Sequence, residues 1–305
     1  MATVLITGGT GMIGTALTKE LISRGYDVLI LSRSKKEDKG KISYAQWDVE
    51  KQTIDKEAIE KADFIVHLAG ANVGEKRWTQ KRKKEIVDSR VKSSKLLVEN
   101  IETIPNKIKA VISASAIGWY KTDPQIPNPK PFVETDTPDD SFLGTTGKLW
   151  EESIKPVKDA GVRLVYLRTG IVLSNEGGAF PEFKKPLYFR TATILGNGKQ
   201  IISWIHIDDL VNLYVYAIEN ENLSGVYNAV APEPVSNKTL MQTIGAALNR
   251  NYICLKVPEF ALKIVLGEMS IEVLKSATVS SSKIEEEGFE FTYKSIEEAV
   301  NELVN

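Results

Sequence analysis

The residues best suited to chemistry lie in a glycine-rich stretch near the start of the chain. Gly8, Gly11 and Gly14 follow an aliphatic run at residues 3–7 and precede apolar residues at helical spacing, which predicts strand, tight turn and helix. Glycine allows a sharp turn, a close approach of the backbone to a pyrophosphate, and tight packing of the helix on the strand. Free N–H groups at the helix N-terminus attract phosphate. The pattern therefore predicts a dinucleotide site whose loop contacts are Gly8, Thr10, Gly11, Met12, Ile13 and Gly14.

The end of the second predicted strand, at residues 27–32, indicates which dinucleotide binds. In dinucleotide folds an acidic residue here accepts a hydrogen bond from the ribose of NAD, whereas an arginine accommodates the 2′-phosphate of NADP. This chain has Ser32 and Arg33 at that point and no carboxylate. We therefore expect NADP(H) in preference to NAD(H), the alternative being a solvated charged loop. Asp48, which ends the next strand, is placed either to reach the adenine or to cap a turn.

Candidate substrate contacts follow the fourth predicted strand. This strand, at residues 63–70, ends in Leu68, Ala69 and Gly70, whose backbone we expect to lie against the cofactor. The next loop combines glycine, charge and tryptophan at the edge of the sheet where loops usually carry function. Within that loop, Asn72 and Arg77 are the candidate substrate-binding residues.

Alternating strands and helices predict an α/β fold with a Rossmann-type, doubly wound parallel sheet. We expect residues 1–170 to form an NADP-binding domain that the chain re-enters at about residues 203–230. Residues 171–202 and 231–305 differ in composition and predict a small mixed α/β C-terminal domain on the substrate side. The long basic helix expected at residues 79–102 is more typical of a solvated helical face than of a nucleic-acid patch.

The overall composition narrows the function classes. Lysine and arginine number 39 and aspartate and glutamate 40, so the net charge of −1 predicts neither a nucleic-acid nor a membrane surface. The single cysteine excludes an internal disulfide framework, and the presence of only two histidines argues against a multi-histidine metal site. No apolar segment is long enough to span a bilayer. We therefore expect a soluble, cytoplasmic protein with no bound metal.

Short runs distributed along the whole chain carry a resemblance to a known family; they are residues 8–14, 67–72, 76–79, 88–91, 113–120, 167–170, 173–179, 204–209, 267–270 and 288–293. Their order resembles the extended, sugar-nucleotide epimerase-like branch of the short-chain dehydrogenase/reductase superfamily. They are most similar to a subgroup called epimerase family proteins, which have their own small C-terminal domain. The resemblance implies an NADP(H)-dependent oxidoreductase, epimerase or dehydratase-like enzyme with a small or sugar-nucleotide substrate, and a homodimer.

The resemblance also implies a catalytic set that this chain contains only in part. Members use a serine at the end of the fifth strand and a Tyr-x-x-x-Lys pair on the next helix, where the lysine cation favours the phenolate and holds the nicotinamide ribose. Here Ser115 and Lys148 stand at matching positions, but Gly144 replaces the tyrosine. Ser89 likewise stands where an asparagine is expected.

Three hypotheses for the chemistry follow from the missing tyrosine. In the first, Tyr120 enters the site from its loop as the acid–base, the alternative being an aromatic side chain packed beside Trp119. In the second, Lys148, Arg77 or Asp209 supports a reaction that needs no tyrosine. In the third, the protein binds NADP(H) without catalysis, as a regulatory or redox-sensing module.

The remaining polar residues of the resembling runs are each assigned from their place in the predicted elements. Arg168, at the end of a strand, either binds an anionic group of the substrate or forms an internal ion pair. Histidine titrates near neutrality, yet we expect His67 to belong to the core and His206 to be a hydrogen-bonded structural residue. Asp208 and Asp209 are expected to cap the helix that follows them.

Overall fold

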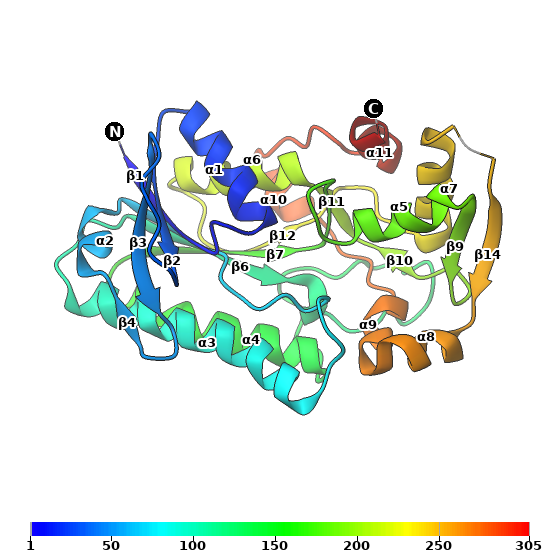
Figure 1. Ribbon diagram of the computed structural model, residues 1–305, viewed down its shortest axis with the longest axis horizontal. Coiled ribbons are helices and arrows are strands. Elements are labelled where there is room, and N and C mark those ends of the chain that lie inside the picture. The colour runs from blue at the N-terminus through cyan, green and yellow to red at the C-terminus, as the bar shows by residue number, and fades with distance from the viewer. Residues whose placement is uncertain (1, 250, 305) are drawn as a thin grey trace.

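Residues 2–249 and 251–304 are described by the computed structural model, which has an eight-stranded sheet at its centre (Figure 1). In spatial order its strands are β12 (Gly225–Ala229), β7 (Arg163–Thr169), β6 (Ala110–Ala116), β5 (Phe64–His67), β1 (Thr3–Thr7), β2 (Asp27–Ser32), β3 (Ile42–Asp48) and β4 (Thr53–Ile54). Neighbours pair in parallel, except that β4 is antiparallel to β3. The strand order reverses between β1 and β5, so the sheet is doubly wound and has its topological switch point there.

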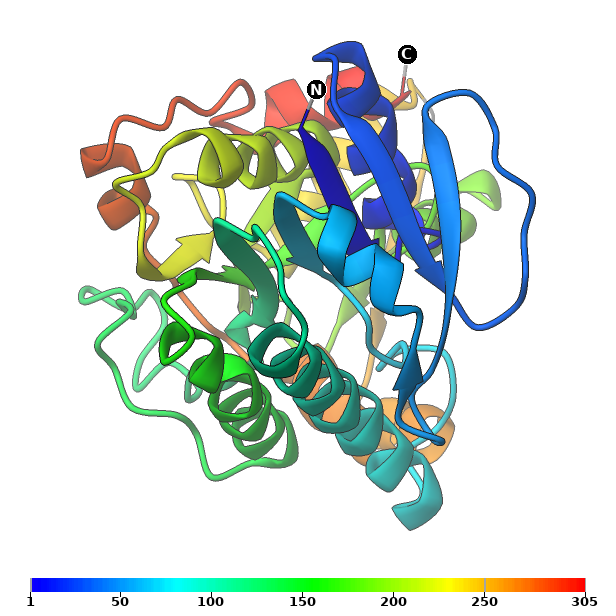
Figure 2. The same ribbon diagram turned by 90° about the vertical axis from the view of Figure 1, so that its left-hand side faces the viewer.

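Helices cover both faces of the sheet (Figure 2). On one face, α1 (Met12–Ser23) and α6 (Ile207–Glu219) pack with apolar strand residues into a single core. On the other face, α2 (Lys56–Lys61), α3 (Gln80–Thr103) and α4 (Phe142–Ile154) enclose a second core. In β1, Val4 and Ile6 belong to the first core and Leu5 to the second. Burial on both faces explains why these strands read as continuous apolar runs.

Local sequence signals set the ends of the helices on the second face. The side chains of Thr79 and Ser141 accept hydrogen bonds from the amides three residues ahead and so cap α3 and α4. The helix predicted at residues 79–102 agrees with α3. After Ile154, α4 gives way to a 3-10 turn around Pro156, because proline has no N–H to continue the helical hydrogen bonds.

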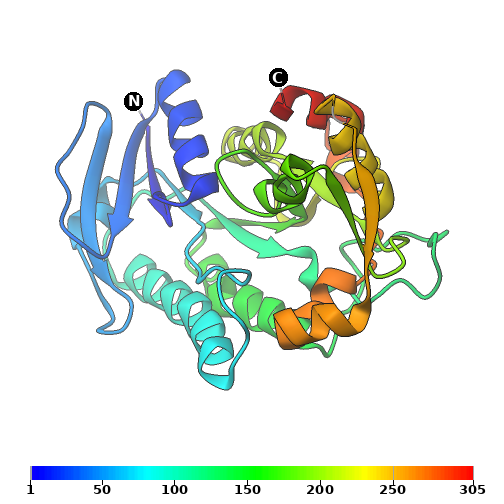
Figure 3. The same cartoon turned by 45° about the vertical axis from the view of Figure 1, so that its right-hand side comes forward.

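A smaller unit follows the large sheet at its carboxyl edge, by which we mean the edge where the parallel strands end (Figures 1 and 3). Its three strand pairs are β8 (Ile171–Leu173) with β11 (Trp204–His206), β9 (Thr191–Leu195) with β14 (Ile253–Val257), and β10 (Ile201–Ile202) with β13 (Val235–Ser236). A third core joins α5 (Phe180–Tyr188), α7 (Asn237–Ala247) and α11 (Ile296–Val304). The remaining helices are α8 (Glu259–Leu266), α9 (Ser270–Leu274) and α10 (Ser282–Glu286).

The architecture confirms the predicted α/β class and its doubly wound, Rossmann-type sheet. The division into two domains stays a prediction, although the third core does draw its residues from 173–204 and 231–303. The pairing of the short strands in the smaller unit was not predicted, because segments of two to five residues carry too little periodicity. Among the described residues, no helix is both long and apolar enough to cross a membrane.

Candidate cofactor and substrate site

The glycine-rich loop between β1 and α1 has no room for side chains at two of its glycines. Gly8 has φ +71°, and a Cβ there would lie 3.0 Å from the carbonyl carbon of Leu68. A Cβ on Gly14 would lie 2.5 Å from the carbonyl oxygen of Gly8. The amide of Gly11 closes the turn by donating to the same oxygen, at 3.0 Å. The backbone therefore requires glycine at positions 8 and 14, as the spacing predicted.

The first turn of α1 begins without a side-chain cap. Gly11 occupies the N-cap position, and no side chain accepts from the amides that follow it. Across the turn, Gly177 and Gly178 of the loop after β8 approach Met12, so that a Cβ on either would be 3.5–3.6 Å from its sulfur. Uncapped amides and the helix dipole favour an anion at this position. Thr10 is exposed and Ile13 partly buried beside it.

The residues predicted to contact the adenosine part of the cofactor lie at the ends of β2 and β3. Ser32 is buried and its hydroxyl accepts from the amide of Ser34 at 3.3 Å. Arg33 is exposed and forms no ion pair with any described residue. Asp48 accepts from the amides of Glu50 and Lys51, each at 3.0 Å, and the Lys51 amide contributes most to lowering the pKa of Asp48. Asp48 thus has the turn role, and its contact with adenine stays a prediction.

A buried hydrogen-bonded chain fixes the ends of β1 and β5 relative to α3. The hydroxyl of Thr7 accepts from the amides of Leu68 and Ala69, each at 3.1 Å, so its hydrogen is donated to Nδ1 of His67 at 2.7 Å. Nε2 of His67 then donates to the hydroxyl of Ser94 at 3.1 Å. Burial, the main cause, lowers the pKa of His67 to about 3, so the imidazole is neutral. The expectation that His67 is a core residue is confirmed.

The loop expected to contact the substrate lies between β5 and α3 and meets the C-terminal segment. Asn72 accepts from the amide two residues ahead at 2.9 Å, and Arg77 is exposed. A Cβ on Gly267 would lie 2.6 Å from Nε of Arg77. The ammonium group of Lys83, in α3, pairs with Glu268. The C-terminal segment therefore closes over one side of this loop.

Ser115, Tyr120 and Arg168 come together, but inside the protein. The hydroxyl of Ser115 donates to the Glu151 carboxylate at 2.7 Å. Arg168 donates to the same carboxylate through Nε at 2.8 Å and through Nη2 at 3.0 Å. Nη1 of Arg168 donates to the hydroxyl of Tyr120 at 3.1 Å, which in turn donates to Asn228 at 2.6 Å. We call these five residues the Glu151 network.

The Glu151 network favours structural roles for two of the predicted site residues. Tyr120 has no exposed surface, and burial raises its pKa to about 12, an effect that Arg168 opposes. Its ring stacks on Phe132 at 5.4 Å. Arg168 is 2% exposed and its cation lies 3.6 Å from the ring centroid of Trp119. The arrangement supports the two alternatives stated above, a packed aromatic at Tyr120 and an internal ion pair at Arg168.

Lys148 is not part of that network. Its side chain is 55% exposed and lies 4.0 Å from Glu152. It lines a cavity of about 260 Å³ with Trp119, Pro138, Glu151, Glu152, Lys155 and Tyr166. The position of the missing tyrosine is also constrained, because a Cβ on Gly144 would lie 2.2 Å from the carbonyl oxygen of Asp139. The backbone of α4 therefore excludes any side chain at residue 144.

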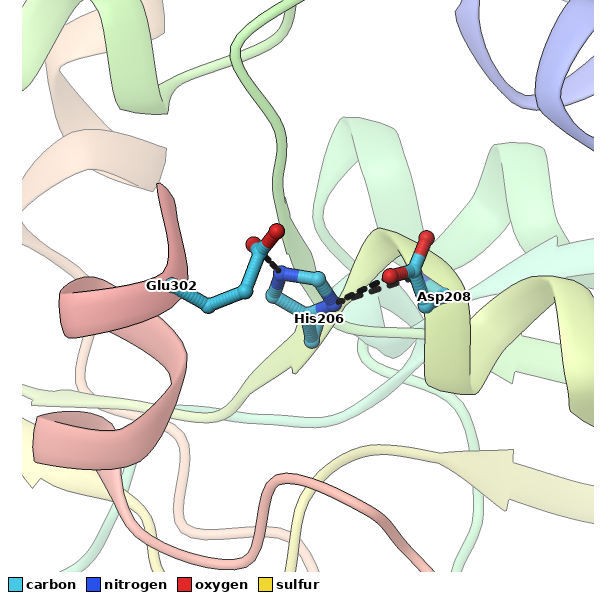
Figure 4. Close-up of side chains that lie close together, drawn as sticks. All are labelled: His206, Asp208 and Glu302. Carbon is cyan, nitrogen blue, oxygen red and sulfur yellow. Dashed lines mark hydrogen bonds and ion pairs between the residues drawn. The ribbon is translucent and has the colours of Figure 1, made fainter. Parts of the chain in front are cut away.

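His206 ties the start of α6 to the C-terminal helix (Figure 4). Its Nδ1 accepts from the amide of Asp208 at 3.2 Å, and its Nε2 donates to Glu302 of α11 at 2.9 Å. The carboxylates of Asp208 and Glu302 lie on opposite sides of the ring, near enough to be considered as metal ligands. Both ring nitrogens are already engaged within the protein, which confirms the expectation of a hydrogen-bonded structural histidine.

The predicted cap at the start of α6 differs from the one observed. His206 is the N-cap residue and accepts the hydrogen bond, whereas Asp209 is fully buried and turns toward the C-terminal segment. There it accepts from the amides of Thr292 and Tyr293, at 2.8 and 2.9 Å. The role of Asp209 differs from the expected cap because sequence spacing does not show partners more than 80 residues away.

The sequence interpretation missed Arg90, which lies in α3 next to the end of β5. Its Nη1 donates to the carbonyls of Ala71 and Ile86, at 3.1 and 3.0 Å. Ser89, the residue compared with the expected asparagine, accepts from the amide of Ala71 at 2.9 Å. The signal that could have identified Arg90 was its place in one of the resembling runs, residues 88–91.

The loop, the switch point and the surrounding residues define a Rossmann-type protein arranged for a dinucleotide. The profile of the NAD dependent epimerase/dehydratase family matches residues 4–229, and the chain belongs to that family. A second profile, described as a domain of unknown function (DUF1731), matches residues 257–303. These matches confirm the resemblance inferred from the sequence.

Similar proteins extend over the whole chain. The epimerase family protein YfhF of Bacillus subtilis (strain 168) is 37% identical over 303 residues, which cover 99% of this chain and 97% of that protein. The human epimerase family protein SDR39U1 (isoform 2), solved with NADPH, is 29% identical with a TM-score of 0.87 and 99% of each chain covered. A UDP-glucuronic acid 4-epimerase from Bacillus cereus, solved with UDP-glucuronic acid and NAD, has a TM-score of 0.81 at 19% identity, with 99% of this chain and 98% of that chain covered, and shares the fold.

Proposed function

We propose that this protein binds NADP(H) and acts as an oxidoreductase, epimerase or dehydratase-like enzyme on a small molecule. The observation that carries the proposal is the loop between β1 and α1, which excludes side chains at Gly8 and Gly14 and leaves the start of α1 uncapped. A pyrophosphate would accept hydrogen bonds from those amides. The NADPH in the human relative supports the same assignment.

The preference for NADP(H) over NAD(H) is supported by the end of β2. Arg33 is exposed and unpaired among the described residues, and Ser32 stands where an NAD-specific protein has a carboxylate. A 2′-phosphate would therefore meet a free guanidinium and no competing acid. Relatives of the same fold solved with NAD make this preference worth testing directly.

In the proposed reaction, the nicotinamide supplies hydride transfer and the protein supplies binding and orientation. The Thr7–His67–Ser94 chain holds the two strands that flank the switch point, and the neutral His67 adds no positive charge there. The proposal uses no tyrosine, because none fits at residue 144 and Tyr120 is buried.

A second candidate, a non-catalytic NADP(H)-binding regulatory protein, is supported by the Glu151 network. The hydroxyl groups of Ser115 and Tyr120 would be available for catalysis if they were free. Instead they donate hydrogen bonds to the buried side chains of Glu151 and Asn228. A protein whose two hydroxyl groups are engaged in this way would bind the cofactor but would not convert a substrate.

Calorimetric titration with NADPH, NADP⁺, NADH and NAD⁺ tests the cofactor assignment. We expect Arg33→Ala to weaken NADPH by about tenfold or more and NADH by less than about threefold, because only NADPH carries the 2′-phosphate. Lys35→Ala, which removes a charge from an exposed neighbour, is the matched control. Equal losses for both nucleotides would remove the NADP(H) preference, and no binding by the wild type would overturn the proposal.

Turnover separates the two candidate functions. The NADPH-loaded protein is incubated with a panel of carbonyl compounds and nucleotide sugars, and cofactor oxidation and product formation are followed. Conversion of any member supports the enzyme, whereas tight binding without conversion across the panel favours the regulatory protein.

A further inference from the structure

Of the arginines in α3 and in the loop before it, two have no carboxylate within 4.0 Å among the described residues, whereas their neighbours do. Arg82 pairs with Glu75 and Glu85, and Arg168 pairs with Glu151. Arg77, one of the unpaired residues, is exposed, so water compensates its charge. Arg90, the other, is partly buried, and its cation lacks both full hydration and a protein counter-ion.

Arg90 borders the region that a bound dinucleotide would occupy. A Cβ on Gly70 would lie 2.9 Å from Cζ of Arg90, and a Cβ on Gly8 would lie 3.0 Å from the carbonyl carbon of Leu68. The glycine-rich loop, residues 68–70 and the guanidinium of Arg90 therefore follow one another in direct contact along the carboxyl edge. A substrate placed beside the cofactor would lie within reach of this side chain.

One side of the guanidinium is held by the protein and the other is free. Nη1 donates to the carbonyls of Ala71 and Ile86, and the cation lies 4.9 Å from the ring centroid of Trp150. Nε and Nη2 donate to no acceptor in the described residues, and they are not sealed from solvent as Nε of Arg82 is. The Nε/Nη2 edge is the one that binds a carboxylate or phosphate through two parallel hydrogen bonds.

The electrostatics of Arg90 favour an anion on that free edge. Burial lowers the pKa of Arg90 to about 10, and the charge of Arg82 contributes to this lowering. The side chain is still a cation at neutral pH, but one that has lost part of its hydration without gaining a counter-ion. An oxyanion would compensate this charge. The hydrogen bonds to the two backbone carbonyls and the contact with the Trp150 ring hold the guanidinium in one orientation for it.

We propose that Arg90 binds an oxyanion, a carboxylate or phosphate group, of the substrate. The inference rests on the proposed function, because it places the substrate beside the cofactor. The Glu151 network contains an example of this two-point binding. There Nε and Nη2 of Arg168 donate to the two carboxylate oxygens of Glu151, at 2.8 and 3.0 Å. The pyrophosphate of the cofactor has its own site at α1, so the substrate class is a small anionic compound.

Titration of the NADP⁺-saturated protein with sodium oxalate and with inorganic phosphate, at constant ionic strength, tests the assignment. We expect saturable binding of at least one probe to the wild type, and binding weaker by about tenfold or more in Arg90→Gln. Arg90→Lys keeps the charge but loses the two-point fork, so its affinity is expected between the two. Lys95→Gln removes a charge from an exposed position of α3 and is expected to bind like the wild type.

The NADPH affinity of the same variants distinguishes the two sources of oxyanion. We expect Arg90→Gln to bind NADPH within about threefold of the wild type, with an unchanged circular dichroism spectrum. A tenfold loss of NADPH would assign Arg90 to the cofactor and overturn the proposal. It is equally overturned if the wild type binds NADP⁺ but neither probe, or if Arg90→Gln binds the probe unchanged. Failure of the wild type to bind any dinucleotide would instead overturn the proposed function, and this inference with it.

Discussion

Arg168 and Arg90 lie on neighbouring parts of the carboxyl edge, yet only Arg168 has a carboxylate partner. The Nε/Nη2 edge of Arg168 is filled by Glu151, and its Nη1 by Tyr120. Arg90 uses Nη1 for two backbone carbonyls and leaves the Nε/Nη2 edge open. An arginine is therefore a structural element where α4 supplies an acid for it, and a candidate ligand-binding group where α3 supplies none.

The largest expected effect comes from removing the acid of the paired arginine. Glu151→Gln leaves the charge of Arg168 without a counter-ion. Unlike Arg90, which is partly exposed, Arg168 is buried and water cannot compensate its charge. We expect the free energy of unfolding to fall by about 3–5 kcal/mol, measured by urea denaturation. The hydroxyl of Ser115 would also lose a charged acceptor.

The controls for this prediction separate charge from helix position. Glu152→Gln changes the neighbouring, exposed carboxylate of α4 and is expected to alter stability by less than about 0.5 kcal/mol. Arg90→Gln leaves no unpaired acid behind, so we expect it to lower stability by only about 1 kcal/mol. Equal destabilisation by Glu151→Gln and Arg90→Gln would mean that the two arginines do not differ in role.

An intermediate effect is expected from pH, through the histidine beside Arg90. The pKa of His67 is about 3 in the folded protein and near 6.5 when unfolded. Between these values the unfolded state binds a proton that the folded state does not, so stability falls as the pH falls below about 6.5. The expected loss is about 1 kcal/mol between pH 6.5 and pH 5.5, measured from urea denaturation at each pH.

The variant His67→Gln shows whether this part of the pH dependence belongs to His67. We expect its stability to change less than that of the wild type over the same interval, whatever its absolute value. Identical pH dependence in the two proteins would mean that folding does not lower the pKa of His67, and the assignment of a neutral imidazole beside Arg90 would have to be abandoned.

The smallest effect is expected at Lys148, which the sequence assigned to catalysis and to the nicotinamide ribose. Its half-exposed side chain approaches only Glu152 among the described acids. We expect Lys148→Ala to change the NADPH dissociation constant by less than about threefold in calorimetry. A loss of tenfold or more would restore the sequence assignment and place the cofactor against α4 as well as along β1 and β5.

Much of the fold was predictable because its signals are local. The glycine spacing requires a turn without side chains at Gly8 and Gly14, and apolar runs buried on both faces predict parallel strands. The absence of a tyrosine at residue 144 was also visible, and the structure adds that Asp139 leaves no room for one. The short strand pairs were less predictable, because they depend on long-range pairings with weak sequence signatures.

The order of residues along the chain is enough to specify the Rossmann-type sheet, the position of the glycine-rich loop and the incomplete catalytic set. Which polar groups are available at the carboxyl edge depends on tertiary packing. Ser115 and Glu151 are 36 residues apart and His206 and Glu302 are 96 apart, so their pairing depends on how helices pack rather than on spacing. A carboxylate compensates the charge of an arginine only when the fold brings the two side chains into contact. Glu151 contacts Arg168 in this way, and no described carboxylate contacts Arg90.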